Sequence, residues 1–153
     1  MFPDDKKPIY DFETQTDTST QKLVMEKDFD TWNSLKKGIQ SSDPEIICNE
    51  REVWWCSLGL NIGHEQDGKN EMFERPMIII RKFSKFTCLC LPLTSSPKNN
   101  SFHQAIPSFG PNDFVVTSQI RLMSTKRFLR KFERVVDRKD FRKIKETLHK
   151  IIS

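Results

Sequence analysis

The sequence predicts a mainly β protein, a small barrel that follows a helical extension and ends in one further helix. Short apolar segments of strand length succeed one another from residue 52 to about residue 136, separated by polar turns. Helical periodicity is confined to two segments, about residues 20–40 and 137–152. No helical segment stands between successive strands, so the pattern favours a barrel over a parallel sheet of βαβ units.

The length and composition are those of a chain that folds, and the net charge differs between its two ends. The 153 residues suffice for one domain with an extension. Leu, Ile, Val and Phe make up 41 of them, about 27%, above the roughly 20% below which a charged chain tends to stay unfolded. Residues 1–50 hold six Lys and Arg against eleven Asp and Glu, whereas residues 118–153 hold twelve against four. The basic last third suits a polyanionic partner.

Residues 1–50 are predicted to form a partly disordered extension that contains one helix. The first 19 residues are polar and rich in threonine, and we expect them to be poorly ordered. From about residue 20 to residue 40 apolar side chains recur every three to five positions, and Gly38 stands near the end of this pattern. The apolar face, which includes Phe29 and Trp32, predicts packing against the following domain, with docking of a partner as the alternative.

Residues 51–153 are predicted to form a single domain of five strands and a final helix. The predicted strands are residues 52–58, 76–82, 87–93, 114–123 and 128–136. Residues 59–68 hold three of the five glycines and predict a loop, residues 82–85 predict a turn, and residues 94–112 predict a long polar connection. Asp137 suits the N-cap of the final helix.

Several kinds of site and location are not indicated. No apolar run reaches the roughly 18 residues of a membrane span, and the acidic residues 1–5 lack the features of a signal peptide, so we expect a cytoplasmic protein with no membrane partner. The four cysteines contain no Cys-x-x-Cys pair and the three histidines are scattered, so we expect no metal and no other cofactor. We interpret the cysteines as small buried apolar side chains.

Two strand ends carry groups that suit a phosphodiester. Arg75 precedes the second predicted strand, and Thr94 and Ser95 follow the third, so pairing of these strands would place a guanidinium beside two hydroxyls. Taken singly, each residue has a simpler structural interpretation. Arg75 would pair with Glu71 or Glu74, and the hydroxyls would belong to a turn.

Six short motifs occur in a fixed order along the domain. They are Arg-Glu-Val-Trp-Trp at 51–55, Gly-His-Glu-Gln at 63–66, Arg-Pro-Met-Ile-Ile at 75–79, Leu-Pro-Leu-Thr-Ser at 91–95, Ser-Gln-Ile-Arg at 118–121 and Lys-Arg-Phe-Leu at 126–129. In this order they resemble the PemK/MazF family of bacterial toxins, over about residues 50–152. The resemblance is to the longer subgroup, which has an N-terminal helical extension.

The resemblance implies a fold, an activity and partners. The implied fold is a small SH3-like barrel, usually a homodimer. The implied activity is that of an endoribonuclease, the toxin of a type II toxin–antitoxin system, which cleaves single-stranded RNA without a metal. The implied partner besides RNA is a cognate antitoxin with a disordered acidic segment.

The resemblance also assigns roles to individual residues. Arg75 matches an arginine that stabilises charge on the scissile phosphate, and Thr94 matches a threonine that hydrogen-bonds to it. His64 is the candidate general base, because an imidazole exchanges protons near neutral pH. The residues expected to contact RNA are Glu65, Gln66, Lys69, Ser95, Gln119 and Arg121.

Two features depart from the family pattern. Six residues, 69–74, separate Gly68 from Arg75 where many relatives have one or two, so the loop over the site is longer. Ser118 stands where some relatives have Asp, which removes one candidate acid–base group. Two alternative functions stay open: a non-hydrolytic toxin of the same fold that poisons DNA gyrase, and a catalytically degenerate barrel that binds RNA or protein.

Overall fold

The computed structural model describes residues 26–153. The predicted disorder of the first 19 residues and the predicted start of the first helix lie outside this range. The helices are α1 (Phe29–Ser41) and α2 (Arg138–Ile152), with two short 3₁₀ helices, η2 (Thr117–Gln119) and η3 (Thr125–Arg127). The strands are β1 (Glu52–Ser57), β2 (Glu74–Lys82), β3 (Thr87–Thr94), β4 (His103–Ala105), β5 (Phe114–Val116), β6 (Arg121–Ser124) and β7 (Phe128–Val135).

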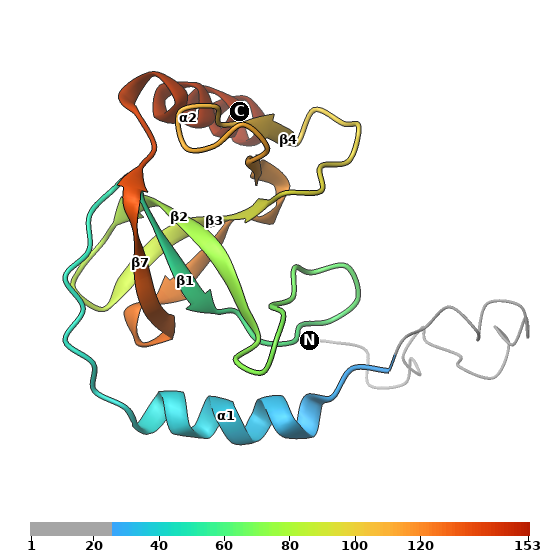
Figure 1. Cartoon of the computed structure of the whole chain (residues 1–153), viewed down its shortest axis with the longest axis vertical. Coiled ribbons are helices and arrows are strands. Elements are labelled where there is room, and N and C mark those ends of the chain that lie inside the picture. Colours follow the sequence, from blue (N-terminus) through green and yellow to red (C-terminus); the bar gives the residue numbers. More distant parts are fainter. Residues whose placement is uncertain (1–25) are drawn as a thin grey trace, which may run out of the picture.

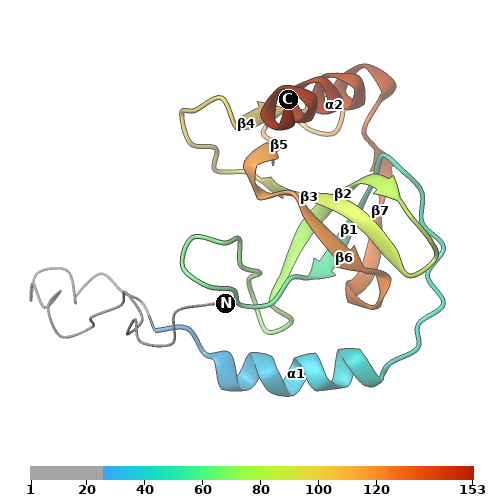
Figure 2. The same cartoon turned by 180° about the vertical axis from the view of Figure 1, so that it is seen from behind.

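The strands form one curved antiparallel sheet, and the predicted mainly β fold is confirmed. Its order is β4-β5-β3-β2-β1-β7, and β6 pairs with β3 beside β5. The chain then passes from β6 through η3 into β7, which returns it to the other edge of the sheet. Figures 1 and 2 show α1 lying across one end of this sheet and α2 across the opposite end.

The prediction of a single strand over residues 114–123 is wrong. The chain forms β5, turns through η2 and continues as β6. The turn is held at Thr117, whose backbone N–H and side-chain hydroxyl both donate to the carbonyl of Phe102, at 2.8 and 3.0 Å. The strand β4 was also missed, because its three residues owe their conformation to pairing with β5 and have no apolar pattern of their own.

Helix α1 begins at Phe29, and the described residues that precede it, 26–28, are not helical. Asp28 caps the helix, and its side chain accepts a hydrogen bond from the backbone N–H of Thr31 at 3.0 Å. Trp32 is the buried residue of the helix, and its ring lies edge-on to Phe73 with ring centroids 5.7 Å apart. Helix α1 therefore packs on the domain, although Phe29 remains exposed.

Both faces of the central strands are buried, which explains their continuous apolar runs. Along β2, Ile78 and Ile80 belong to a core cluster shared with α2, whereas Met77 and Ile79 belong to a second cluster on the other face. All four cysteines are buried and free, as their interpretation as small apolar side chains requires. The prediction that Asp137 caps the final helix is confirmed, since its carboxylate accepts from the N–H of Asp140 at 2.8 Å.

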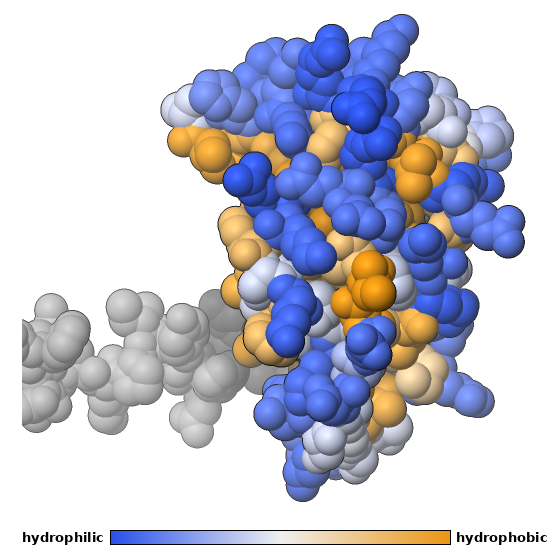
Figure 3. Space-filling model, turned by 90° about the vertical axis from the view of Figure 1, so that its left-hand side faces the viewer, coloured by the Kyte–Doolittle hydropathy of each residue, from blue (hydrophilic) through white to orange (hydrophobic). Residues whose placement is uncertain are grey.

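Apolar side chains also reach the surface. Figure 3 shows apolar groups in the middle of one face, with others nearer its edges, among hydrophilic residues that dominate the two ends of the molecule. The large exposed apolar residues of the chain include Ile47, Phe83, Phe86 and Leu122. Within residues 26–153 no helix is long and apolar enough to cross a membrane.

Candidate functional site

Strand pairing brings the two strand-end residues together. The antiparallel ladder between β2 and β3 pairs Met77 with Pro92. Continuing this register by two residues places Arg75 opposite Thr94, at the edge where β2 begins and β3 ends. On the other side of β2, Arg75 pairs with Cys56 of β1, so it stands in the middle of three adjacent strands. The antiparallel pairing of β2 and β3, which contains a bulge between Ile79 and Arg81, therefore creates the juxtaposition that the sequence predicted.

The guanidinium of Arg75 is held by neutral oxygen atoms. Its Nε donates to the backbone carbonyl of Asp67 at 2.9 Å, and its Nη1 donates to the carbonyl of Leu93 at 3.2 Å. With the amide of Gln66 oriented so that its oxygen faces Arg75, that oxygen accepts from Nη2 at 2.9 Å. Burial lowers the pKa of Arg75, and the nearby Asp67 carboxylate acts in the opposite direction.

The carboxylates near Arg75 are engaged elsewhere. Glu74 accepts two hydrogen bonds from the guanidinium of Arg130, at 2.9 and 3.0 Å, and this fork replaces the pair between Arg75 and Glu74 that was the simpler interpretation. The carboxylate of Asp67 forms an ion pair with Lys27 at 2.8 Å. Among residues 26–153 no carboxylate lies within ion-pair distance of Arg75. Its positive charge therefore remains available to an anion.

A pocket of about 330 Å³ opens beside this arginine. Four of the predicted site residues line it, namely Lys69, Arg75, Thr94 and Ser95. The hydroxyl oxygen of Thr94 accepts a hydrogen bond from the N–H of Ser96 at 3.1 Å, which fixes its orientation at the end of β3. The lining also includes Arg134 and Ser96, so three cationic side chains and three hydroxyls face the pocket. Two carboxylates line it as well, Glu74 and Asp113, and they are paired with Arg130 and Arg134. The cations and hydroxyls suit a phosphodiester.

One wall of the pocket is aromatic, and the sequence analysis missed it. Trp55 and Phe132 stack with ring centroids 5.5 Å apart, and Phe109 meets Phe132 edge-on at 5.4 Å. The guanidinium of Arg134 lies 4.3 Å from the centre of the Phe109 ring. The signal available in the sequence was the alternation of β1, which turns Trp55 to the face opposite the buried Trp54.

The loop of residues 59–68 carries His64, Glu65 and Gln66 and is tied to Gln119. The side-chain oxygen of Gln119 accepts from the N–H of Gln66, and its amide nitrogen donates to the carbonyl of His64, both at 3.0 Å. The side chain of Gln119 thus holds the loop, which is a different use from the predicted RNA contact. His64 and Glu65 are exposed on the loop and do not line the pocket.

Arg121 lies with the loop rather than with the pocket. It is half-buried on β6, opposite Cys90 of β3, and burial lowers its pKa while the carboxylate of Glu65 acts against that change. Its charge also lowers the pKa of Arg127, whose own burial is the larger cause. The predicted site residues therefore form two groups, one lining the pocket and one on or beside the loop.

The described residues offer no cluster of metal ligands. Among residues 26–153 no three His, Cys, Asp or Glu side chains stand close enough together to hold an ion. The four thiols are buried in one core cluster, with Cys56 on β1, Cys88 and Cys90 on β3, and Cys48 before β1. Burial raises the pKa of Cys88 to about 12.

Comparison with known proteins places these features in a family. Residues 49–152 match the family described as the PemK-like, MazF-like toxin of type II toxin–antitoxin systems. None of the curated proteins compared matches the sequence.

Solved structures share the fold. One is MazF (Form-I) from Deinococcus radiodurans, at 16% identity and a TM-score of 0.58, with 70% of this chain and 97% of that chain covered. A second is the MazE–MazF complex (Form-II) from the same organism, at 12% identity and a TM-score of 0.51, with 71% and 97% covered. A third is an endoribonuclease in complex with its cognate antitoxin from Mycobacterial species, at 14% identity and a TM-score of 0.50, with 69% and 95% covered. On the match over residues 49–152 and this shared fold, the chain belongs to the PemK-like, MazF-like toxin family of type II toxin–antitoxin systems.

Proposed function

We propose that the protein is an endoribonuclease that cleaves single-stranded RNA at the pocket beside Arg75. The proposal rests on the orientation of the Arg75 guanidinium and on its lack of a neutralising partner among the described residues. Its guanidinium is oriented by three neutral acceptors, has no carboxylate partner among the described residues, and shares a pocket with the Thr94 hydroxyl. A preoriented positive charge of this kind stabilises the charge that develops on phosphorus during phosphodiester cleavage.

The proposed reaction is an attack by the ribose on its own phosphate. A base removes the proton of the 2′-hydroxyl, O2′ forms a bond to phosphorus, and the bond from phosphorus to O5′ breaks. The products are a 2′,3′-cyclic phosphate and a 5′-hydroxyl, whose proton comes from an acid at the site. Because the nucleophile is the 2′-hydroxyl of the RNA itself, this step consumes no water molecule and needs only a base and an acid.

Each role has a proposed residue. Arg75 stabilises the phosphorane and donates the proton to O5′, and the lowering of its pKa by burial is in the direction that a proton donor needs. Thr94 orients a non-bridging oxygen through its hydroxyl. His64 acts as the base from the exposed loop, and Glu65, Gln66, Lys69, Ser95 and Arg121 are the proposed RNA contacts. The proposed part of Gln119 in RNA binding is to hold the loop that carries Glu65 and Gln66.

Two partners belong to the same proposal. Two of the similar structures are complexes of a toxin or an endoribonuclease with an antitoxin, which supports a cognate antitoxin here, and we propose that its disordered acidic segment competes with RNA for the basic surface. We also propose a homodimer. The exposed Phe83 and Phe86 of the β2–β3 turn and the exposed Leu122 of β6 are the kind of apolar surface that an interface buries.

The test uses matched oligonucleotides in the presence of EDTA. A single-stranded RNA should be cut to a cyclic phosphate and a 5′-hydroxyl end, whereas the same sequence with one deoxyribose on the 5′ side of the cut should stay intact. Cleavage of the deoxy substrate would exclude attack by the 2′-hydroxyl. Binding of RNA without any cleavage would favour the degenerate barrel, and inhibition of DNA gyrase by the same preparation would favour the gyrase poison.

A further inference from the structure

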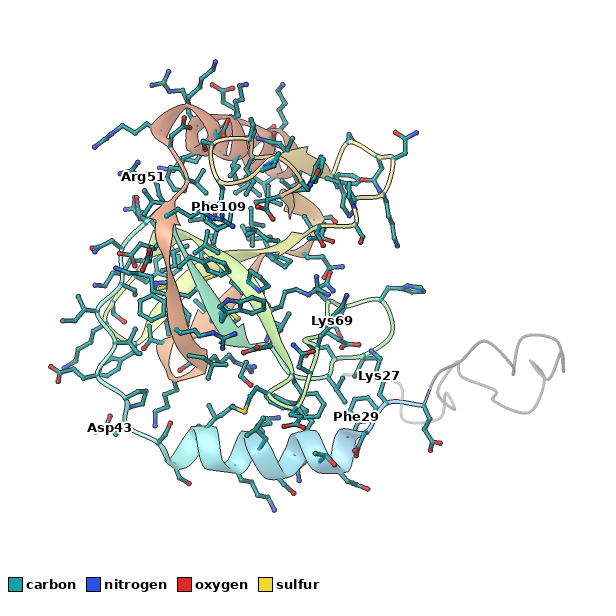
Figure 4. The ribbon with its side chains drawn as sticks, in the orientation of Figure 1. Lys27, Phe29, Asp43, Arg51, Lys69 and Phe109 are labelled. Atoms are coloured by element: carbon teal, nitrogen blue, oxygen red, sulfur yellow. The ribbon has the colours of Figure 1, made fainter. Side chains whose placement is uncertain are left out.

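The N-terminal segment reaches into the loop that borders the site. The family match begins at residue 49, so Lys27 and helix α1 lie outside it. The Lys27 ammonium nevertheless has three acceptors on this loop: the carbonyl of Asn61 at 2.5 Å, the carbonyl of Gly63 at 3.2 Å and the carboxylate of Asp67 at 2.8 Å. Each of the three N–H groups of an ammonium can donate one hydrogen bond, so the donors of Lys27 are matched by these acceptors. Figure 4 shows Lys27 at the start of α1, beside the loop.

Asp67 connects this lysine to the site. One oxygen of its carboxylate pairs with Lys27, and the other accepts from the backbone N–H of Asn61 at 2.5 Å. The backbone carbonyl of the same residue accepts from Nε of Arg75 at 2.9 Å. A single residue therefore separates Lys27 from the guanidinium, and the position of Asp67 affects both.

Helix α1 holds the start of the same loop through Trp32. The ring lies so close to Gly59 that an added Cβ would stand 2.2 Å from it, and Gly59 has φ +82°. Trp32 also contacts Phe73, which is part of the lengthened segment before β2. The guanidinium of Arg127 lies 5.9 Å from the centre of the Trp32 ring and donates to the carbonyl of Leu58 at 3.2 Å. The loop is thus held at its start by Trp32 and at its end by Lys27.

We propose that residues 27–41 form a clamp on the loop of residues 59–68, and that Lys27 is a positioning residue for Arg75 acting through Asp67. The inference rests on the role proposed for Arg75. The physical reason is preorganisation: a charged donor stabilises a transition state only where its support holds it in place, and small displacements of a catalytic group are costly. The clamp supplies this support from a part of the chain that the family match does not include.

Three variants test the clamp: Lys27→Met, which keeps the length of the side chain and removes its charge, Lys27→Arg, which restores donors, and Lys37→Met as the control. Lys37 is an exposed lysine of α1, and its side chain makes no hydrogen bond or ion pair with residues 26–153. We expect Lys27→Met to lower kcat about tenfold with little change in KM, because the lost interaction acts on transition-state geometry. Lys27→Arg should recover most of the rate and Lys37→Met should match wild type. Unchanged kcat in Lys27→Met would overturn the proposal.

Hydrogen exchange gives a readout that does not depend on activity. The N–H of Asn61 donates to the carboxylate of Asp67, and the N–H of Gln66 donates to the side chain of Gln119, so both amides report on the clamped loop. Their exchange should accelerate at least tenfold in Lys27→Met while the amides of β1 to β3 keep wild-type rates. Uniform acceleration over the whole sheet would show a general loss of stability and overturn the assignment of a positioning role.

A double variant separates this inference from the proposed function. If Lys27 acts through Arg75, adding Lys27→Met to Arg75→Ala should cause little further loss of kcat, because both changes remove the same stabilisation. Full activity of Arg75→Ala would refute the role of Arg75 while the exchange experiment still decides whether the clamp exists. An inactive Arg75→Ala together with a wild-type Lys27→Met would refute the clamp alone.

Discussion

The positively charged guanidinium of Arg75 is held in one orientation by its hydrogen bonds. Its contacts are two backbone carbonyls and one side-chain amide, so its orientation does not depend on a neutralising ion pair. The carboxylate that precedes it in the sequence, Glu74, is bound to Arg130 across 56 positions of the chain. Arrangements of this kind keep a charge both ordered and available.

We predict that Arg75→Ala lowers kcat by roughly 10²–10³, the loss typical of removing one preorganised donor. Thr94→Ala should cost less, because its hydroxyl only orients the phosphate, and Thr94→Ser should keep most of the activity. Single-turnover cleavage of an RNA oligonucleotide measures these rates, and thermal melting checks that the variants stay folded. Arg81→Ala, an exposed arginine of the same strand, is the control. Wild-type activity of Arg75→Ala would refute the site.

The buried thiols predict how stability depends on pH. Burial raises the pKa of Cys88 from its ordinary value of 9.0 to about 12, and burial raises the pKa of Cys56 and Cys90 as well. A group that holds its proton more tightly when folded stabilises the fold below its unfolded pKa, and this contribution is lost as pH rises towards the folded pKa. The free energy of unfolding should therefore fall between pH 9 and pH 12, as urea titrations would measure.

A chemical test of the same thiols is independent of that titration. At pH 8 a thiol-specific reagent should leave the folded protein unmodified and should modify all four cysteines after unfolding in guanidinium chloride. Rapid modification of any cysteine in the folded protein would contradict its burial.

At the level of secondary-structure elements, the packing of α1 depends on one glycine. Gly59 and Gly63 both have positive φ, at 82° and 57°, but only Gly59 has a neighbour that a Cβ would strike. Replacing either glycine by alanine therefore strains the backbone in the same way, but only the change at Gly59 also causes a clash with Trp32.

We predict that Gly59→Ala detaches α1 and that Gly63→Ala does not. Both changes should cost about 1–2 kcal/mol for an L-residue in the left-handed region, and Gly59→Ala should cost more because of the clash. Loss of the buried environment of Trp32 would appear as a red shift of tryptophan fluorescence in Gly59→Ala alone. Equal destabilisation with no spectral difference would show that the contact contributes nothing to the docking of α1.

At the scale of the whole molecule, charge is divided along the chain. Residues 118–153 hold twelve Lys and Arg against four Asp and Glu, and they form β6, β7 and α2. A surface that binds phosphates through such groups releases counterions from the RNA.

Binding of a non-cleavable RNA should weaken steeply with salt. A plot of log affinity against log salt concentration should be linear, with a slope of about −0.7 for each phosphate contacted in a single strand. Fluorescence anisotropy measures this slope over a salt range of about 50 to 200 mM. Light scattering on the same samples should show a dimer at micromolar concentration. A flat salt response would contradict phosphate binding, and a monomer would contradict the proposed interface.

Local sequence patterns are enough to predict several of the strands and helices. The apolar runs of β2 and β3 and the capped helix α2 lie close to their predicted bounds, because alternation, periodicity and capping act over a few neighbouring residues. The antiparallel pairing of β2 with β3 also follows from the short turn that joins them, which brings Arg75 and Thr94 to the same edge. The bulge between Ile79 and Arg81, which shifts the register by one residue, has no local signal in the sequence.

Contacts between residues far apart in the chain are visible in the folded protein and not in the sequence. The fork between Glu74 and Arg130, the contact of Lys27 with Asp67 and the aromatic wall of Trp55, Phe109 and Phe132 bring together residues from separate strands and from the N-terminal segment. The division of residues 114–123 into β5, η2 and β6 has the same origin, in hydrogen bonds to Phe102. No local pattern encodes such pairs, because each depends on how the whole sheet curves before its side chains can meet.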